Sequence, residues 1–381
     1  MSYLTDPELL ALRQRLHAEP ELSGHERHSA ELLAATLARY QPDALWRDIG
    51  GHGLLALFDS GKPGPSVLLR ADMDALPITE QSGRAYCSQH AGVAHLCGHD
   101  GHSAILMGVA AKLAHQRPSG GRVYLLWQPA EETGAGAQAV LADPAFVCQP
   151  DWVYALHNLP GYPLGEVVVR TGAFSASVRS LILCLQGKPA HAAEPEHGCN
   201  PALAMAELLQ LAARLSCNEP EDPAFALVTP VYAHLGEKAY GTSAGYGEVH
   251  FTLRTFSQAG MEALEQALLT ALGQLAQHYG LAIRHHWLEE FQASENDAAA
   301  VALLVEEATA CGLPVVERPV PFKWGEDFGL FTQRFRGALF GMGAGEQHPA
   351  LHNADYDFPD ALLQPASTLL YRLALRATLH D

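Results

Sequence analysis

The sequence predicts an α/β protein in which a mostly parallel sheet carries helices on both faces and a ferredoxin-like α+β domain is inserted. Short apolar strands alternate with helices over the first 174 residues, which is typical of a parallel sheet. From about residue 175 the order becomes β-α-β-β-α-β, the ferredoxin-like pattern. The length of 381 residues also exceeds the roughly 250–300 residues that one core usually supports. We therefore expect a larger domain formed by 1–174 and 289–381, and an inserted domain over 175–288.

Two helices open the larger domain. Asp6, Pro7 and Glu8 provide an N-cap, a first-turn proline and a first-turn acid for a helix that runs to about Ala18. An apolar stripe from Ala30 to Leu37 predicts the next helix. The elements expected after these are strands over 54–58 and 67–70, a helix over 102–115, a strand over 123–127, a helix near 136–141 and a strand over 152–155.

The insert and the last part of the chain follow the same reasoning. The insert is expected to contain a strand over 178–185, a helix over 201–215, strands over 225–234 and 249–256, a helix over 261–279 and a strand over 281–287. The larger domain then resumes with helices over 297–311 and near 327–335, a strand over 338–342 and a final helix after Pro359.

Composition excludes several classes of partner. Lys plus Arg number 24 against 42 Asp plus Glu, a formal charge of -18, so binding of nucleic acid or of an anionic membrane is not expected. No apolar run reaches the ~18–20 residues of a membrane span. The first residues lack the features of a signal peptide. The seven cysteines form no paired framework, so we expect a cytoplasmic protein.

Side chains of metal-ligand type follow the predicted strands. Because ligands of open α/β sheets bind beyond the carboxyl ends of the strands, these positions are candidate site residues. They are Asp72 and Asp74 after 67–70, Glu131 and Glu132 after 123–127, His157 after 152–155, Cys97 and His99 at the helix start, and His352 after a glycine-rich loop.

Each of these residues alone is more simply explained without a metal. A single Cys-x-His pair is more often a packing feature, adjacent glutamates are usually solvated, and lone histidines are mostly hydrogen-bonded structural residues. Together, five soft or borderline ligands at one sheet edge favour a metal site. Asp72 and Asp74 would either bind the metal directly or orient a ligand histidine.

Eight stretches, in order along nearly the whole chain, closely resemble the M20 metallopeptidase and amidohydrolase family, in its hippurate hydrolase and auxin-conjugate hydrolase branch. They are LHAEPEL (16–22), RADMDALP (70–77), CGHDGH (97–102), QPAEE (128–132), LHN (156–158), GKPAHAA (187–193), EDF (326–328) and LHN (351–353). The resemblance implies a zinc-peptidase-like α/β domain interrupted by a smaller dimerisation or lid domain.

The resemblance also implies a role for each matching residue. The ligands of two divalent ions, Zn²⁺, Mn²⁺ or Co²⁺, would be Cys97, His99, Glu132, His157 and His352. Glu131 would be the catalytic base. His191, in the insert, would stabilise the oxyanion formed on the substrate carbonyl, often from the partner subunit, and Arg254 would bind the substrate carboxylate.

One stretch departs from the family pattern. The family usually has an asparagine thirteen residues before the arginine, whereas this chain has Gly241-Thr242-Ser243-Ala244. A substrate contact is therefore missing or is replaced by Thr242 or Ser243. This departure leaves the amino-acid side of the substrate open.

We expect a metal-dependent amidohydrolase that cleaves the amide of small N-acyl amino acids. A dipeptidase or aminopeptidase of the same family is one alternative. An inactive metal-binding or interaction protein is another, and the intact pair Glu131-Glu132 argues against it. We also expect a homodimer or higher homo-oligomer formed through the inserted domain.

Overall fold

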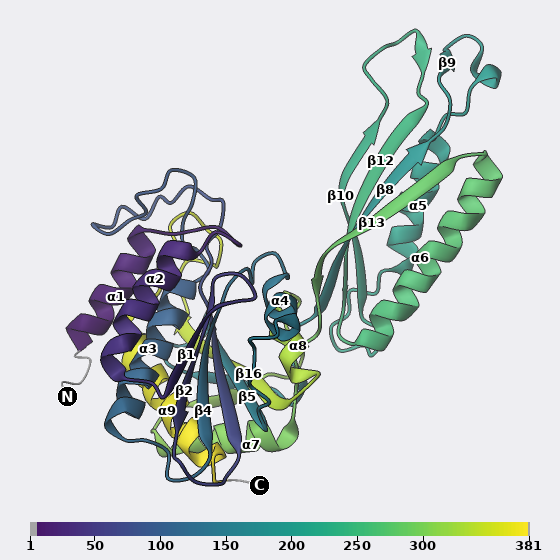
Figure 1. The fold of residues 1–381 in the computed structure, drawn as a ribbon. Coiled ribbons are helices and arrows are strands. Elements are labelled where there is room, and N and C mark those ends of the chain that lie inside the picture. The colour runs from purple at the N-terminus through teal and green to yellow at the C-terminus, as the bar shows by residue number, and fades with distance from the viewer. Residues whose placement is uncertain (1–5, 380–381) are drawn as a thin grey trace. The chain divides into compact units, whose positions relative to one another are not determined.

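The computed structural model describes residues 6–379 and separates the chain into two compact units (Figure 1). The smaller unit contains Ser175–Ala293 and Val320–Gly325, and the rest of the chain forms the larger unit. The sequence placed 320–325 in the larger domain instead. These residues join the smaller unit because the Ala176 N–H donates to Trp324 O at 3.0 Å and Ser175 pairs with Phe322 in a parallel bridge. Pairing between residues so far apart in the sequence cannot be predicted from the composition of either segment.

The larger unit is built on an eight-stranded mixed sheet. Four pairs of neighbouring strands are parallel. The other three pairs, β1 with β2, β2 with β4 and β16 with β6, are antiparallel. In sheet order the strands are β1 (Ala44–Ile49), β2 (Gly53–Asp59), β4 (Arg122–Gln128), β3 (Ser66–Asp72), β5 (Trp152–Pro160), β16 (Arg336–Gly345), β6 (Val167–Val169) and β15 (Val315–Glu317). A short pair, β7 (Gly172–Ala173) and β14 (Glu295–Asn296), lies beside it.

Helices cover both faces of this sheet (Figure 1). One face carries α1 (Asp6–Ala18), α2 (Arg27–Leu37), η1 (Ala38–Tyr40), α3 (His99–His115), α7 (Ala298–Ala310) and α9 (Leu363–Ala377), which follows η3 (Asp360–Leu362). The shorter helices α4 (Gly136–Ala142) and α8 (Gly329–Thr332) lie on the other face. The central strands are buried on both faces, which explains why β3, β4 and β5 are near-continuous apolar runs in the sequence. The predicted fold class is confirmed.

Three elements differ from the prediction in ways that matter for the site. Helix α3 begins at His99 rather than 102, because Gly98 has φ +99° and turns the chain directly into the helix. Strand β5 extends to Pro160, so His157 lies within the strand and not after it. The helix predicted near 327–335 is only Gly329–Thr332.

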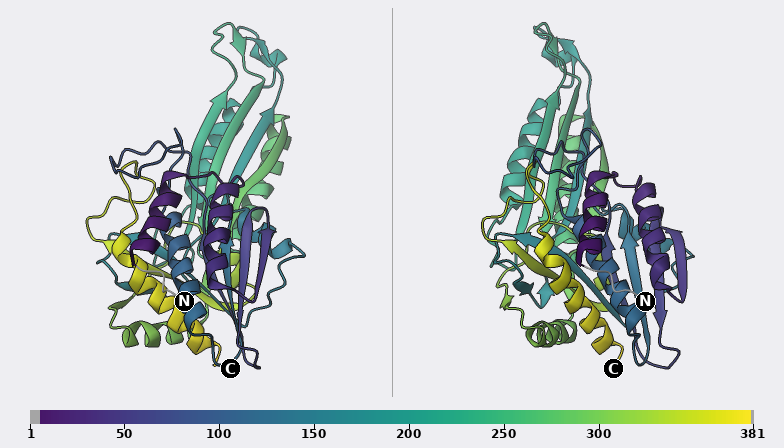
Figure 2. Two further views of the ribbon diagram at one scale, coloured as in Figure 1. Left: turned by 60° about the vertical axis from the view of Figure 1, so that its left-hand side comes forward. Right: turned by 90° about the vertical axis from the view of Figure 1, so that its left-hand side faces the viewer.

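The smaller unit is a four-stranded antiparallel sheet with two helices on one face (Figure 2). Its strands, in sheet order, are β10 (Ala226–Leu235), β12 (Tyr246–Thr255), β8 (Ser177–Gln186) and β13 (Ala282–Phe291). Every second residue of the central strands, such as Leu183 and Phe251, is buried against α5 (Ala202–Leu215) and α6 (Gln258–Tyr279). A two-stranded ribbon, β9 (Ala190–His191) with β11 (Thr242–Ser243), and η2 (Pro195–His197) complete the unit.

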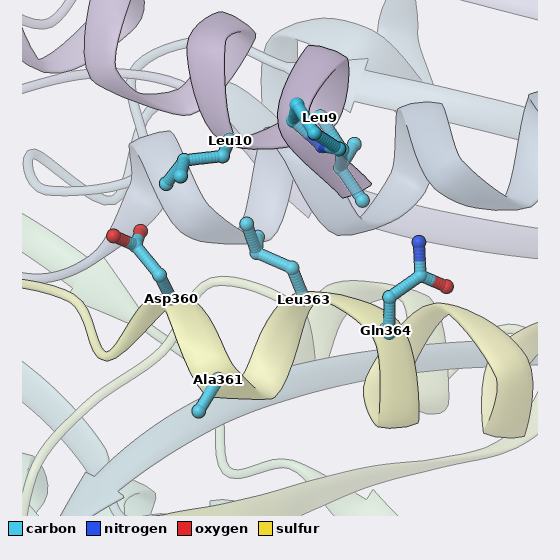
Figure 3. Close-up of a pocket in the computed structure, with 7 residues that line it drawn as sticks. Leu9, Leu10, Asp360, Ala361, Leu363 and Gln364 are labelled. Carbon is cyan, nitrogen blue, oxygen red and sulfur yellow. The ribbon is translucent and has the colours of Figure 1, made fainter. Parts of the chain in front are cut away.

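A hollow of about 420 Å³ lies between α1 and the start of α9 (Figure 3). Leu9 and Leu10 approach it from α1, and Asp360, Leu363 and Gln364 approach it from the facing segment. Among the described helices, none is both long enough and apolar enough to span a membrane.

Candidate metal centre

The structure brings together all five residues expected to bind metal. Ligand atoms of Cys97, His99 and His157 lie within 4.8 Å of one another, as do those of Cys97, Glu132 and His352. Cys97 belongs to both groups. The side chains come from the start of α3, the turn after β4, strand β5 and the loop after β16.

His99 has the orientation of a metal ligand. Its Nδ1 lies 3.0 Å from Asp74 O and 3.2 Å from Asp74 Oδ1, so Nδ1–H donates and Nε2 is left to face the other candidate ligands. That Nε2 is buried with no hydrogen-bond partner among the described residues. It lies 3.7 Å from Glu132 Oε1 and 3.8 Å from Glu131 Oε2. Asp74 therefore orients His99, which corresponds to one of the two roles that the sequence left open for this aspartate.

His157 is oriented in the same manner. Its Nδ1 donates to the carbonyl of Asn158 at 2.8 Å, and its Nε2 lies 3.5 Å from Cys97 Sγ. Burial, followed by the neighbouring His102, lowers the pKa of His157 to about 3. The ring is therefore neutral, the form that binds a metal ion.

His102 forms a candidate ligand group with Asp72 and His99, but both of its ring nitrogens are engaged. Nδ1–H donates to Asp72 Oδ1 at 2.7 Å, and Nε2 accepts from the backbone N–H of Asn158 at 3.1 Å. Asp72 thus fixes His102, which in turn supports the segment that carries His157. No role was predicted for His102 or Asn158, since a buried chain of hydrogen bonds has no signature in residue spacing.

His352 is held in a strained backbone conformation, with φ +66°. Its N–H donates to Leu96 O at 2.7 Å, beside Cys97. The Tyr356 hydroxyl donates to Asn158 Oδ1 at 2.6 Å, and Asp357 is ion-paired with the buried Arg13. These contacts fix the loop so that His352 Nε2 lies 3.8 Å from Glu132 Oε1.

A second polar group lies on the other side of Glu131. Carboxylate oxygens of Glu131, Glu326 and Asp327 are all within 4.8 Å of one another and all three residues are buried. The guanidinium of Arg70 compensates them. It contacts Glu326 at 3.0 Å, Asp327 at 2.7 Å and Asp72 at 2.7 Å. No role was predicted for Arg70, although it is the first residue of one of the eight matching stretches.

The ionisable groups of the site fit a divalent cation. Burial, and then the carboxylates of Glu326 and Glu132, raises the pKa of Glu131 well above its ordinary value. Burial raises the pKa of Glu132 to about 7 and that of the Cys97 thiol well above its ordinary value. The positive charge near these three acidic groups is not enough to stabilise their charged forms, and a bound metal ion would supply more. Thiolate, imidazole and carboxylate together are ligands for zinc and similar metals.

The smaller unit contains the other three predicted residues. His191 and Thr242 are paired across β9 and β11, and Thr242 lines a hollow of about 300 Å³ with Tyr246 and others. Nδ1 of His191 accepts from the Ala193 N–H at 3.0 Å, so its Nε2 carries the proton. Arg254 lies on β12 and donates to Lys323 O at 2.6 Å.

Comparison with known proteins identifies the family. The model for "Peptidase family M20/M25/M40" matches residues 68–376. This chain belongs to that family. An N-acetyl-L-cysteine deacetylase of Bacillus subtilis is 31% identical over 97% of this chain and 88% of its own length. An N-acetyldiaminopimelate deacetylase of the same organism is 30% identical over 91% of this chain and 92% of its own.

Solved structures agree with the M20 assignment. A dinuclear metal binding peptidase of the M20 family from Bacillus subtilis superposes with a TM-score of 0.84 at 26% identity, over 98% of each chain. A putative aminohydrolase from methicillin-resistant Staphylococcus aureus gives a TM-score of 0.88 at 25% identity, over 98% of this chain and 97% of its own. The predicted family is confirmed, and with it an amidohydrolase that uses two divalent metal ions.

Proposed function

We propose that this M20 enzyme hydrolyses the amide bond of small N-acyl amino acids, with N-acetyl amino acids as its main substrates. The single observation that carries the proposal is the convergence of two ligand groups on Cys97, with the buried Glu131 beside them. Two of its relatives, at 30–31% identity over nearly their whole length, are deacetylases of N-acetyl amino acids.

One ion would be held by Cys97, His99 and His157 and the other by Cys97, Glu132 and His352. When bound, two divalent ions lower the pKa of a water molecule towards neutrality and polarise the substrate carbonyl. Zn²⁺, Mn²⁺ and Co²⁺ all suit this ligand set, and the thiolate favours Zn²⁺. Metal analysis of the purified enzyme decides among them.

Glu131 is proposed as the catalytic base. It follows the same strand as Glu132, is 6% exposed and lies at the edge of the ligand group. The buried carboxylates around it raise its pKa, and a general base works best with a pKa near the operating pH. Its carboxylate takes a proton from the attacking water and returns it to the nitrogen of the leaving amine.

His191 and Arg254 are proposed as substrate-binding groups from the smaller unit. The Nε2–H of His191 is a hydrogen-bond donor suited to an oxyanion. Arg254 provides a guanidinium for the substrate carboxylate. Thr242, paired with His191, is proposed to take the place of the asparagine that the family usually has.

The variant Glu131→Gln tests the base. It should retain two metal ions per chain while kcat falls by about 10²–10⁴-fold, the usual contribution of a general base. Full turnover in this variant would rule out Glu131 as the base, and loss of metal would instead make it a ligand.

A panel of acetyl-, benzoyl- and aminoacyl-amino acids at equal concentration separates the substrate classes. The proposal expects the acetyl compounds to have the highest kcat/KM. Preference for benzoyl compounds would instead support the hippurate hydrolase branch. Preference for a free amine would indicate a dipeptidase, and no hydrolysis with both metals loaded would indicate a binding protein.

We also propose a homodimer formed through the smaller unit in the cytoplasm. Strand β10 is an edge of its sheet and exposes Val231, Tyr232 and Leu235, an apolar edge that pairing would cover. All seven cysteines are unpaired in the part of the chain that the structure describes, as expected for a reducing compartment. A single monomeric species in sedimentation would refute the dimer, and cell fractionation tests the location.

A further inference from the structure

The turn that presents Glu131 has an unfavourable backbone conformation. Ala130, directly before Glu131, has φ +54°, the left-handed region that favours glycine. A non-glycine residue remains in this region only where its surroundings hold it, and such residues concentrate at functional sites. The neighbours of Ala130 therefore decide where the carboxylate of Glu131 lies.

One buried side chain holds Ala130. The N–H of Ala130 donates to Oε1 of Glu26 at 2.8 Å. Glu26 is fully buried and is separated from Ala130 by 104 positions in the sequence. The same Oε1 also accepts from the N–H of Gly24 at 2.8 Å. The carbonyl of Ala130 accepts from Gly136 N–H at 3.0 Å, which closes the turn from its other side.

The side chain of Glu26 does not cap the helix that follows it. It occupies the N-cap position of α2, but its side chain makes no capping hydrogen bond. Glu21 caps the helix instead, with acceptors 3.0 Å from His28 N and 2.8 Å from Ser29 N. N-cap side chains that bond the first N–H groups of a helix are usually the shorter Ser, Thr, Asp and Asn, and Glu26 makes no such bond. Because Glu21 has taken over this task, the carboxyl of Glu26 is available for the turn after β4.

We propose that Glu26 is a positioning residue for catalysis: its hydrogen bond to the Ala130 N–H holds the turn in the conformation that places the Glu131 carboxylate for proton transfer. This inference rests on the proposed role of Glu131. It assigns no contact between Glu26 and substrate or metal.

Two substitutions of Glu26 separate the hydrogen bond from other effects. Glu26→Leu removes the acceptor, whereas Glu26→Gln keeps an acceptor oxygen of the same reach. The amide of Gln has nearly the same size and shape as the carboxyl of Glu26, so its oxygen can accept hydrogen bonds from the same two N–H groups. On the best N-acetyl amino acid of the panel, Glu26→Leu should lower kcat about 10- to 100-fold, as expected for a misplaced catalytic group. Glu26→Gln should stay within about threefold of the parent kcat. Both should keep KM and two metal ions per chain.

A second-site substitution tests the backbone argument directly. Glycine adopts the left-handed conformation without a steric penalty, so Ala130→Gly should restore most of the kcat lost in Glu26→Leu while changing the parent enzyme little. Glu21→Leu is the matched control, because it removes the cap of α2 beside Glu26 but no contact with Ala130. It should lower Tm and leave kcat unchanged.

The outcomes separate the two hypotheses. If Glu131→Gln abolishes turnover with both metals bound but Glu26→Leu keeps the parent kcat, Glu26 has no positioning role. If Glu26→Leu loses the same amount of kcat with and without Ala130→Gly, the positioning role is also refuted, because the conformation of the turn would then not explain the loss. If Glu131→Gln is fully active, the assignment of the base itself has failed.

Discussion

Replacement of Arg70 by methionine should destabilise the larger unit severely. The Arg70 side chain is 1% exposed and contacts Asp72, Glu326 and Asp327 at 2.7–3.0 Å. A fourth contact, at 2.9 Å, joins it to Gln128. Removing one partner of a buried ion pair costs about 3–5 kcal/mol, because the remaining charge has no compensation. Here three carboxylates lose their cation, so we expect a loss of about 4 kcal/mol or more, against a total stability of about 5–15 kcal/mol.

Unfolding by guanidinium chloride in the presence of a chelator measures this loss of stability without the contribution of bound metal. Trp127 and Trp152 are buried in the larger unit, whereas Trp287 and Trp324 belong to the smaller unit, so tryptophan fluorescence follows the unfolding of both units and the substitution should shift the part that comes from the larger one. The deficit of the variant should be largest near pH 8 and smaller near pH 5. Freed buried carboxylates have raised pKa values, whereas those of the unfolded chain titrate near pH 4. The folded variant then binds more protons than the unfolded chain, and its stability falls as the pH rises.

A double variant checks the cause. Arg70→Met with Asp327→Asn removes one of the stranded charges, so it should be more stable than the sum of the two single effects predicts, by about 1–3 kcal/mol. A deficit of less than about 1 kcal/mol in Arg70→Met, or strict additivity in the double variant, would refute the view that Arg70 compensates this acidic group.

Three further predictions concern other parts of the larger unit. Burial opposes protonation of His17, but Asp100 and Glu80 outweigh it and raise its pKa to about 9. Protonated His17 should stabilise the folded state by about 3 kcal/mol. Denaturation curves at several pH values should show this contribution in full below pH 6.5 and its loss as the pH rises through about 9. The variant His17→Gln should lack it at every pH. Gly101→Ala should lower stability by about 1–3 kcal/mol, since its Cβ would lie 2.3 Å from the buried ring of Phe358 and this overlap outweighs the gain in helix propensity. A rise in Tm would contradict the packing argument. When the free metal concentration is about 1,000 times the Kd, bound metal stabilises the folded state by about 4 kcal/mol, so removal of the metal by a chelator should lower Tm accordingly. An unchanged Tm would argue against binding of metal by the folded state alone.

Much of the fold could be predicted because burial leaves a periodic signal. The apolar run at 67–70 marks the core of β3, and the stripe of Ala30, Leu33 and Leu37 marks α2. The strands β1, β6 and β15 were not predicted. They are short or partly exposed strands at the outer part of the sheet, and their sequences alternate too little to differ from loops.

The clustering of candidate ligand side chains could be predicted, but the contacts that support them could not. Cys97, His99 and Glu132 stand beside predicted strands or helices and have distinctive chemistry. Glu26 is an ordinary glutamate on a polar helix entrance, and only the folded structure shows that its carboxyl reaches Ala130. Contacts over such sequence distances depend on tertiary packing, for which a single sequence contains no direct signal.

The ligand groups are also spread along the order in which the chain is made. Cys97 leaves the ribosome early, but His352 follows it only after the whole smaller unit has been synthesised. A nascent chain can therefore offer Cys97, His99 and His157 to an ion well before the group of Cys97, Glu132 and His352 exists. On the proposed ligand assignment, the second ion can be bound only after the segment with His352 has been synthesised, so the centre is expected to fill in two steps.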